Sequence, residues 1–308
     1  MKVLITGANG FIGSRLARLL VKTNFQVYAL VRPNSNLSRI QDIVPQLELW
    51  HGDLLDDEKL CNYLEQIRPD ICLHLAWYAV PGKYLEAREN LGMLNASLNL
   101  ATKLAEVGCQ KFIGIGTCIE YDTAFGYLSE FSPIKPTNLY AASKLALQQL
   151  LTQWGKTVKM ELAWIRLFYQ YGPGEDIRRL IPTVICSLLQ SKPAQLTRGE
   201  QIRDYLHVED VAAAIWAVAK SNLSGVVNVG SGKPVTVAEM ALTVAQILGK
   251  TDLLDLGAIP YRTGDPMFIC ANNQLLLSQT DWSPKYALEE GLANTIMWWR
   301  DYLKSEDN

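Results

Sequence analysis

Three glycines at intervals of three residues constrain this chain more than any other feature. Gly7, Gly10 and Gly13 follow the apolar run Val3-Leu4-Ile5 and precede leucines at helical spacing. A buried strand, a glycine turn and a helix are the context in which such glycines predict a dinucleotide site. Gly7 would allow the tight turn, Gly10 the approach of a pyrophosphate, and Gly13 close packing of helix on strand. The free N–H groups at the helix start would face the phosphates. A tight turn without a ligand is the alternative.

Composition and cysteine spacing exclude several classes of protein. A chain of 308 residues can bury one large or two modest cores. Its formal net charge of −2 gives no reason to expect a nucleic-acid surface. No apolar run approaches the length of a membrane span, and the first residues enter a strand directly, so we expect neither a membrane segment nor a signal peptide. The six cysteines form no C-x-x-C pair, which argues against a metal site or disulfide framework and fits a reducing cytoplasm.

Strands and helices alternate along the chain. Apolar runs predict strands at 3–5, 26–31, 47–50, 71–75, 112–115, 162–165 and 226–229. Helical spacing and capping residues predict helices after Asp56, at 84–107, 140–154 and 208–220, after Thr236, and at 288–303. Repeated β-α units predict an α/β fold with a parallel sheet covered by helices on both faces. Ligands of such sheets bind outside the carboxyl ends of the strands.

A second informative stretch holds Tyr140 and Lys144, which share one face of a helix because they are four residues apart. An ordinary tyrosine, with a pKa of about 10, is a poor acid or base at neutral pH. A lysine cation beside it, together with a cationic nicotinamide ring, would favour the phenolate and lower that pKa. The pair then predicts a proton donor to a carbonyl or an acceptor from an alcohol. The alternative is an exposed Tyr–Lys pair without function.

Taken together, these motifs resemble those of the extended short-chain dehydrogenases/reductases, the nucleotide-sugar epimerase/dehydratase group. The glycine turn at 7–13, Tyr140-x-x-x-Lys144 and the stretch 203–208 (Arg-Asp-Tyr-Leu-His-Val) occur in the family's order. The resemblance implies a Rossmann-type doubly wound parallel sheet with a smaller, interleaved C-terminal substrate lobe. We expect the dinucleotide-binding domain at 1–168 with a returning segment at about 204–230. The substrate lobe would take 169–203 and 231–308.

The resemblance also implies roles for individual residues. The cofactor would be held by Gly7, Asn9, Gly10, Phe11, Ile12, Gly13, Asp53, Leu54, Ala76 and Phe168, with Tyr140 and Lys144 at the nicotinamide ribose. The catalytic groups would be Thr117, Tyr140 and Lys144. The substrate would contact Cys118, Tyr169, Arg203 and Arg262. The two arginines would bind its diphosphate, since guanidinium groups bind phosphate bidentately. Trp77 departs from the small residue usual in the family, and Tyr169 stands where relatives carry an asparagine.

Departures from the family pattern narrow the expected reaction. Sugar 4,6-dehydratases of this family carry Asp-Glu directly after the threonine, but here Cys118 and Ile119 follow Thr117. Ile119 cannot transfer protons, so we expect a ketone reduction, an alcohol oxidation or a C4 epimerisation. Arg32 follows the second strand where NAD enzymes usually have an acid, so it favours NADP(H), with NAD(H) as the alternative.

The C-terminal half resembles the CDP-abequose and CDP-paratose synthase group at 199–204, 256–260, 267–268 and 271–273. This predicts NADPH-dependent reduction of the 4-keto group of a nucleotide-linked 4-keto-6-deoxy or 3,6-dideoxy hexose. A C4 epimerase with retained NAD is the first alternative. A cofactor-sensing or scaffold protein without catalysis is the second. The expected partners are a nucleotide-diphosphate sugar and a second copy of the chain in a homodimer, with no metal.

Overall fold

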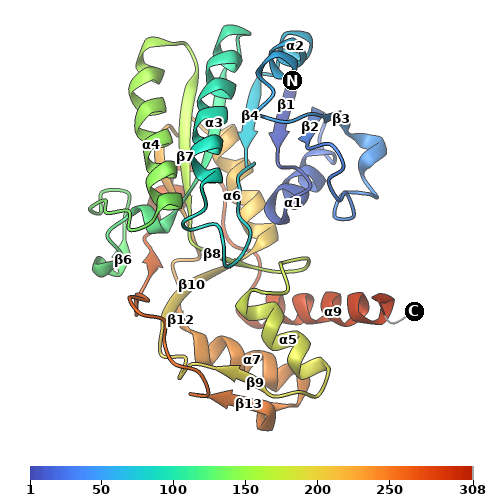
Figure 1. Cartoon of the computed structure of the whole chain (residues 1–308), viewed down its shortest axis with the longest axis vertical. Helices are drawn as coiled ribbons and strands as arrows, with labels where there is room; N and C mark the ends of the chain where they lie inside the picture. The colour runs from blue at the N-terminus through green and yellow to red at the C-terminus, as the bar shows by residue number, and fades with distance from the viewer. Residues whose placement is uncertain (307–308) are drawn as a thin grey trace.

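The computed structural model describes residues 1–306, and a seven-stranded sheet lies at its centre (Figure 1). The strand order is β3-β2-β1-β4-β5-β7-β11, and all neighbouring strands are parallel. The strands are β1 (Lys2–Thr6), β2 (Gln26–Val31), β3 (Glu48–His51), β4 (Ile71–His74), β5 (Lys111–Thr117), β7 (Glu161–Leu167) and β11 (Gly225–Val229). The order reverses direction between β1 and β4, which is where parallel sheets of this kind bind ligands.

Helices cover both faces of this sheet. On one face lie α1 (Phe11–Leu20), α6 (Val208–Lys220) and α8 (Gln274–Gln279), and on the other α2 (Asp57–Ile67), α3 (Glu89–Glu106) and α4 (Leu139–Trp154). Successive β1 side chains point to opposite faces, so Val3 and Ile5 pack in the α1 and α6 layer while Leu4 packs in the α2 to α4 layer. The predicted α/β fold is therefore confirmed.

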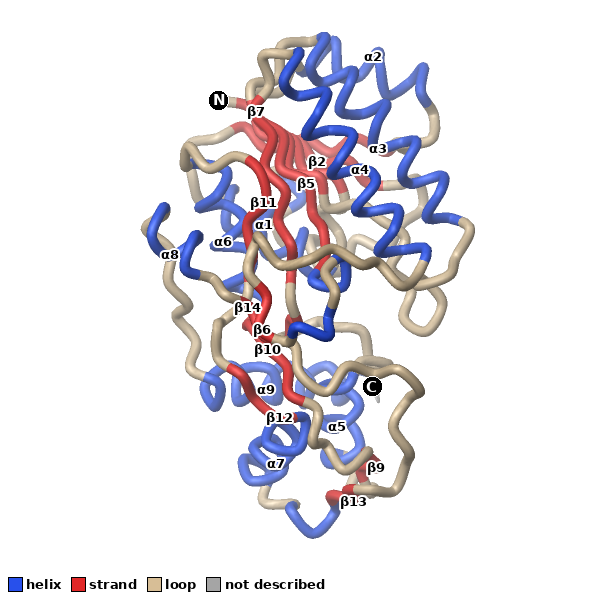
Figure 2. Tube along the Cα trace, turned by 90° about the vertical axis from the view of Figure 1, so that its left-hand side faces the viewer, coloured by secondary structure: helices blue, strands red, loops and turns tan. Residues whose placement is uncertain are grey.

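A smaller group of elements lies below the carboxyl ends of the strands (Figure 2). Its helices are α5 (Leu180–Leu189), α7 (Val237–Leu248) and α9 (Leu288–Glu306), which share one apolar core. Its strands are β8 (Tyr169–Tyr171), β10 (Ile202–His207) and β12 (Pro234–Thr236) in one sheet, and β9 (Ala194–Leu196) with β13 (Leu254–Leu256) in another. The pair β6 (Tyr127–Leu128) and β14 (Cys270–Ala271) lies between this group and the large sheet.

One predicted helix begins later than expected. The apolar spacing predicts a helix from residue 84, but α3 begins at Glu89. The side-chain amide of Asn90 donates to the carbonyl oxygens of Tyr84 (2.7 Å) and Ala87 (2.8 Å). This folds residues 84–88 into turns, because a side chain satisfies the carbonyl groups that a helix would use. The segment consequently lies over the carboxyl edge of the sheet.

Candidate active site

A tight turn at Gly7 joins β1 to α1. Gly7 has a φ of +72°, which residues with a side chain rarely adopt. A Cβ atom on Gly13 would lie 2.1 Å from the Gly7 carbonyl oxygen, so only glycine lets α1 pack this closely. Gly10 is the N-cap, and no described side chain caps α1, so the N–H groups of the first turn, at Phe11 and Ile12, remain for a ligand. This cradle fits the diphosphate of a dinucleotide.

The loop that follows β2 lies beside this turn. The Asn9 side-chain amide donates to the carbonyl oxygen of Asn36 at 3.0 Å. Arg32 is exposed, and within residues 1–306 its guanidinium forms no hydrogen bond or ion pair. The hydroxyl of Ser35 is buried and also lacks a hydrogen-bond partner among these residues. A free cation and an unsatisfied hydroxyl at the end of β2 are the groups that a 2′-phosphate would use.

Asp53 and Leu54, predicted at the adenine, follow β3. The Asp53 carboxylate accepts a hydrogen bond from the Leu55 N–H at 3.0 Å, which forms a local turn. The Leu54 side chain is buried in the core beneath α2 and α3. It therefore packs inside the protein, so the predicted adenine contact would fall to its backbone.

A chain of buried hydrogen bonds fixes the backbone at Ala76. Thr6 pairs with His74 in register, and its hydroxyl accepts from the Ala76 N–H (3.2 Å) and contacts His74 Nδ1 (2.8 Å). His74 Nε2 contacts the hydroxyl of Ser97 (2.8 Å), which donates to the Met93 carbonyl oxygen (2.6 Å). Because the Ser97 hydroxyl donates to Met93, His74 Nε2 carries a proton and donates to Ser97. Burial lowers the pKa of His74 to about 3, so the ring is neutral and its Nδ1 accepts from the Thr6 hydroxyl.

Tyr140 and Lys144 stand on the first turns of α4, which Asn138 caps. The Tyr140 ring meets the Tyr84 ring edge-on, with 4.9 Å between centroids. Lys144 is buried, and its ammonium donates to the Ile115 carbonyl oxygen on β5 at 2.7 Å. Burial lowers the pKa of Lys144 to about 7. In the protein chain itself, burial raises the pKa of Tyr140, whereas the predicted lowering also depends on a cationic nicotinamide ring.

Thr117 ends β5, and a buried carboxylate fixes its position. Glu120 accepts from the Thr117 N–H at 2.8 Å and forms an ion pair with Arg166 Nε at 2.7 Å. The indole N–H of Trp164 also donates to Glu120, at 3.2 Å. Glu120 and Arg166 are both almost fully buried, and burial raises the pKa of Glu120. Sequence reasoning did not assign Glu120 a role, although its place three residues after Thr117 completes a capping box.

Cys118, Phe168 and Tyr169 pack together beside Thr117. Cys118 and Phe168 are buried in one small apolar cluster with Tyr169 against it. Burial raises the pKa of the Cys118 thiol to about 12, so it remains a thiol at neutral pH. The tyrosine that replaces the family's asparagine lies near Arg203, whose guanidinium is 5.4 Å from the centroid of the Tyr169 ring.

The two arginines predicted to bind the diphosphate differ in their surroundings. Arg203 on β10 is buried and pairs with Asp265, with 2.8 Å between Nη2 and Oδ1. Gln201 donates to the other oxygen of Asp265 at 3.1 Å. Arg262 is exposed on the same loop as Asp265. The charge of Arg203 is therefore already balanced, whereas Arg262 projects from a loop that Arg203 anchors.

A third arginine, Arg179, has no role in the prediction from sequence. It precedes α5, and its guanidinium lies 5.5 Å from the centroid of the Tyr84 ring. Among residues 1–306 it forms no hydrogen bond or ion pair through its side chain. It lies close enough to Tyr140 to favour the phenolate, opposing burial. The charge of Arg179 also acts on the carboxylates of Glu175 and Asp176. A half-buried guanidinium without a direct hydrogen bond beside the Tyr84 ring marks Arg179 as a candidate anion contact, which only its place before α5 could have signalled.

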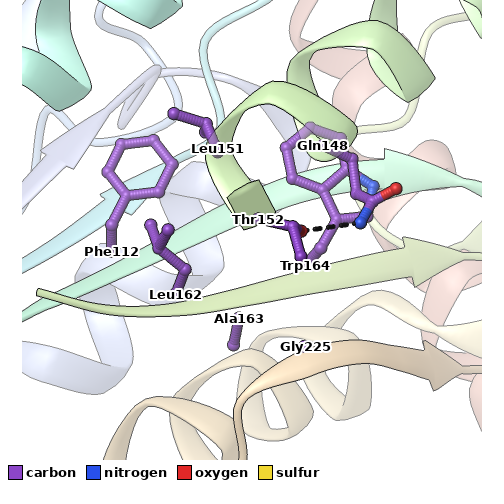
Figure 3. A pocket seen from close by; sticks show the side chains of 8 residues that line it. All are labelled: Phe112, Gln148, Leu151, Thr152, Leu162, Ala163, Trp164 and Gly225. Atoms are coloured by element: carbon purple, nitrogen blue, oxygen red, sulfur yellow. Dashed lines mark hydrogen bonds between the residues drawn. The ribbon is translucent and has the colours of Figure 1, made fainter. Parts of the chain in front are cut away.

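Figure 3 shows a small pocket elsewhere on the sheet. Its lining residues are Phe112, Gln148, Leu151, Thr152, Leu162, Ala163, Trp164 and Gly225. Most of the strand residues among them stand early in β5, β7 and β11, so the pocket lies away from the carboxyl edge and from Tyr140.

No helix in the described part of the chain is long and apolar enough to span a membrane. Within that part, no cluster of three His, Cys, Asp or Glu side chains could hold a metal ion.

Comparisons with known proteins agree with this geometry. The model of the "NAD dependent epimerase/dehydratase family" matches residues 3–230. A UDP-glucose 4-epimerase of Halalkalibacterium halodurans is 26% identical over 98% of this chain and 96% of its own length. A dTDP-glucose 4,6-dehydratase of Salmonella typhimurium is 25% identical over 97% and 92%, respectively. The structure of the Thermus thermophilus UDP-glucose 4-epimerase in complex with NAD superposes with a TM-score of 0.85 and 26% identity, covering 97% of this chain and 99% of that one.

Proposed function

Because the chain belongs to the NAD dependent epimerase/dehydratase family, we propose that it is a C4 epimerase of a nucleotide-linked hexose. The observation that carries the proposal is that Thr117 is the last residue of β5, while Lys144, on the helix that also carries Tyr140, donates to the Ile115 carbonyl oxygen of the same strand. Neither of the two residues after Thr117 suits a dehydratase. Cys118 is a buried thiol and Ile119 has no proton to transfer. The site therefore retains the groups for oxidation and reduction at one carbon and lacks the acid–base pair for expelling water.

The protein groups act on the oxygen at C4. Bound NAD would supply the two-electron acceptor for C4, the same two electrons for reducing the 4-ketone afterwards, and in its oxidised form a positive ring charge that favours the phenolate of Tyr140. Tyr140 would accept the proton of the 4-hydroxyl group and later return it to the oxygen of the 4-ketone. The Thr117 hydroxyl would hydrogen-bond that oxygen, and the Lys144 ammonium would stabilise the phenolate. The buried carboxylate of Glu120 keeps Thr117 in place for this contact.

The residues proposed to hold the cofactor line the carboxyl edge. The turn from Gly7 to Gly13 and the first turn of α1 would hold the diphosphate, and Asp53 and Leu54 would lie along the adenine. Ala76 and Phe168 would lie along the nicotinamide half. We propose that Arg179, whose guanidinium forms no hydrogen bond among residues 1–306, binds the substrate's phosphate or sugar oxygens, together with Arg203 and Arg262.

A second candidate function is the NADPH-dependent reduction of a nucleotide-linked 4-keto-6-deoxy or 3,6-dideoxy hexose, as in the CDP-abequose and CDP-paratose synthases. The unpartnered Arg32 and the unsatisfied hydroxyl of Ser35 favour it, because both suit the 2′-phosphate of NADP(H). The same Thr117, Tyr140 and Lys144 would serve this reaction. The two candidates thus differ in cofactor and in net electron flow.

The deciding experiment incubates the purified protein with UDP- and dTDP-hexoses without added cofactor. Formation of C4 epimers, followed by chromatography and proton NMR, together with NAD released on denaturation, would support the epimerase. NADPH consumption with CDP-, dTDP- or GDP-4-keto-6-deoxyhexoses, with no epimer formed, would replace it by the reductase. Neither reaction with any substrate would overturn both.

We further propose a homodimer in the cytoplasm, with a dinucleotide-binding domain at 1–168 and about 204–230 and a substrate lobe at 169–203 and 231–308. Leu91 on α3 and Leu150 on α4 are 53% and 52% exposed, respectively, and would be covered if these helices paired. Light scattering of the intact chain measures the assembly, and charged substitutions at both leucines should yield monomers.

A further inference from the structure

Trp77 lies directly after the Ala76 backbone, at the exit of β4. The face of its indole is 3.8 Å from the Lys144 ammonium nitrogen, measured to the ring centroid. The same indole forms a T-shaped pair with the Tyr140 ring, with 6.5 Å between centroids and 78° between planes. A large aromatic ring thus touches both members of the Tyr–Lys pair.

The indole is held in a fixed orientation. Its N–H donates to the side-chain oxygen of Asn90 at 2.8 Å. Asn90 is fully buried and uses both amide hydrogens on the carbonyl oxygens of Tyr84 and Ala87. Its oxygen therefore has to face the indole, and the amide cannot turn over without losing all three bonds. Asn90 thus links the Trp77 indole to the turn at residues 84–88, whose Tyr84 ring contacts the Tyr140 ring.

Apart from the indole, few groups offset the loss of hydration that burial imposes on the Lys144 ammonium. Within residues 1–306 its ammonium forms no ion pair, and its hydrogen bond goes to the neutral Ile115 carbonyl. Glu120, the acidic group that faces it, is engaged by Arg166. A buried ammonium without an anionic partner is unfavourable, and an indole face is the aromatic surface that best stabilises a cation.

We propose that Trp77 is a positioning residue that keeps Lys144 in its cationic form and directs its ammonium toward the reacting phenol. The proposal deepens the proposed function and rests on it for its catalytic consequence. Its structural consequence, the charge state of Lys144, can be measured without turnover.

The expected effect of removing the indole is a shift in the titration of Lys144. Burial already lowers its pKa to about 7, so the ammonium is lost as pH rises through neutrality. The other charged or titratable groups facing Lys144 are Glu120 with Arg166, His74 on β4, and Tyr140 on its own helix. None of these residues is replaced in a Trp77 variant. Loss of a desolvated cation–π contact should lower the Lys144 pKa by about one further unit, so the ammonium disappears at a lower pH.

The test compares Trp77→Leu, which removes the aromatic face, with Trp77→Phe, which keeps a face but loses the bond to Asn90. Protein labelled with [ε-¹⁵N]lysine is titrated by NMR, and Lys144→Met identifies the signal. We expect a shift of about one unit in the leucine variant and a smaller shift in the phenylalanine variant. Trp77→Met serves if circular dichroism shows that the leucine variant does not fold.

A matched control is Trp216→Leu, which removes an indole that lies 5.9 Å from the Lys220 ammonium on α6. It should leave the Lys144 signal unchanged. Where the protein turns over a substrate, kcat should fall at high pH as Lys144 loses its proton. In the Trp77→Leu variant this fall should occur at a pH lower by the same amount. The proposal would be overturned if the Lys144 pKa were the same in the parent and in every variant. It would also be overturned if Trp77→Leu and Trp77→Phe shifted that pKa equally. A shift in Lys144 without activity on any sugar would refute the proposed function and leave the role of Trp77 standing.

Discussion

Gly13→Ala tests whether the glycine turn is built as the structure shows. An alanine Cβ at this position would lie 2.1 Å from the Gly7 carbonyl oxygen and 2.9 Å from the Gly7 carbonyl carbon. Both neighbours are backbone atoms, so no flexible side chain can move aside. Either α1 shifts away from β1 or the turn opens, by about 1 Å in each case.

The magnitude follows from two opposing effects. Overpacking of this kind costs about 1–3 kcal/mol. Replacing a helical glycine with alanine contributes up to about 1 kcal/mol in the other direction. We expect a net decrease of about 1–2 kcal/mol in the free energy of unfolding. A displaced helix start would also weaken the N–H contacts to a diphosphate, so the Kd for NAD should rise at least about tenfold, a loss of about 1.4 kcal/mol.

Gly92→Ala is the matched control, because it makes the same change inside a helix without a close contact. The nearest atom to its added Cβ would be Leu55 Cδ2 at 3.9 Å. This variant should be as stable as the parent or up to about 1 kcal/mol more stable, with unchanged NAD affinity. Urea denaturation followed by circular dichroism, and calorimetric titration with NAD, measure both quantities. Equal stability and affinity in the two variants would refute the reasoning about Gly13.

Two further predictions concern buried carboxylates. Glu120→Ala should lower the free energy of unfolding by about 3–5 kcal/mol in urea denaturation, because it leaves the Arg166 guanidinium buried without its partner at 2.7 Å. Adding Arg166→Met should recover part of that loss, and no recovery would contradict the role given to the pair. Asp204→Ala should destabilise by at least about 3 kcal/mol, because Asp204 accepts from the N–H groups of Ser231, Gly232 and Ala271 at 2.6–3.0 Å. A change below about 1 kcal/mol by the same method would show that these N–H groups find other acceptors.

Local patterns predicted the parts of the site that a few neighbouring residues determine. The glycine turn follows from spacing within seven residues, and the shared face of Tyr140 and Lys144 follows from helical geometry. The central strands were predicted because their apolar runs are buried on both faces, as Val3, Leu4 and Ile5 show.

Contacts between distant segments could not be predicted in the same way. Nothing in the neighbourhood of Arg203 indicates that Asp265 pairs with it, since 62 residues separate the two. The predicted helix start at residue 84 is wrong, because the Asn90 side chain binds the carbonyl groups of Tyr84 and Ala87 and α3 begins only at Glu89. The prediction for Tyr140 considered Lys144 and a nicotinamide cation but not burial, which depends on the whole fold and raises the pKa of this phenol.

The measurement that tests the central claim most directly is the turnover of Tyr140→Phe. The substrate is the UDP- or dTDP-hexose that the parent protein epimerises fastest. Removing one hydroxyl should lower kcat by about 10²–10⁴-fold, because proton transfer at the 4-oxygen is lost. Affinities for NAD and for the sugar nucleotide should stay within about threefold of the parent values. A Tyr140→Phe variant that forms the C4 epimer at the parent rate would contradict the proposed role of this phenol.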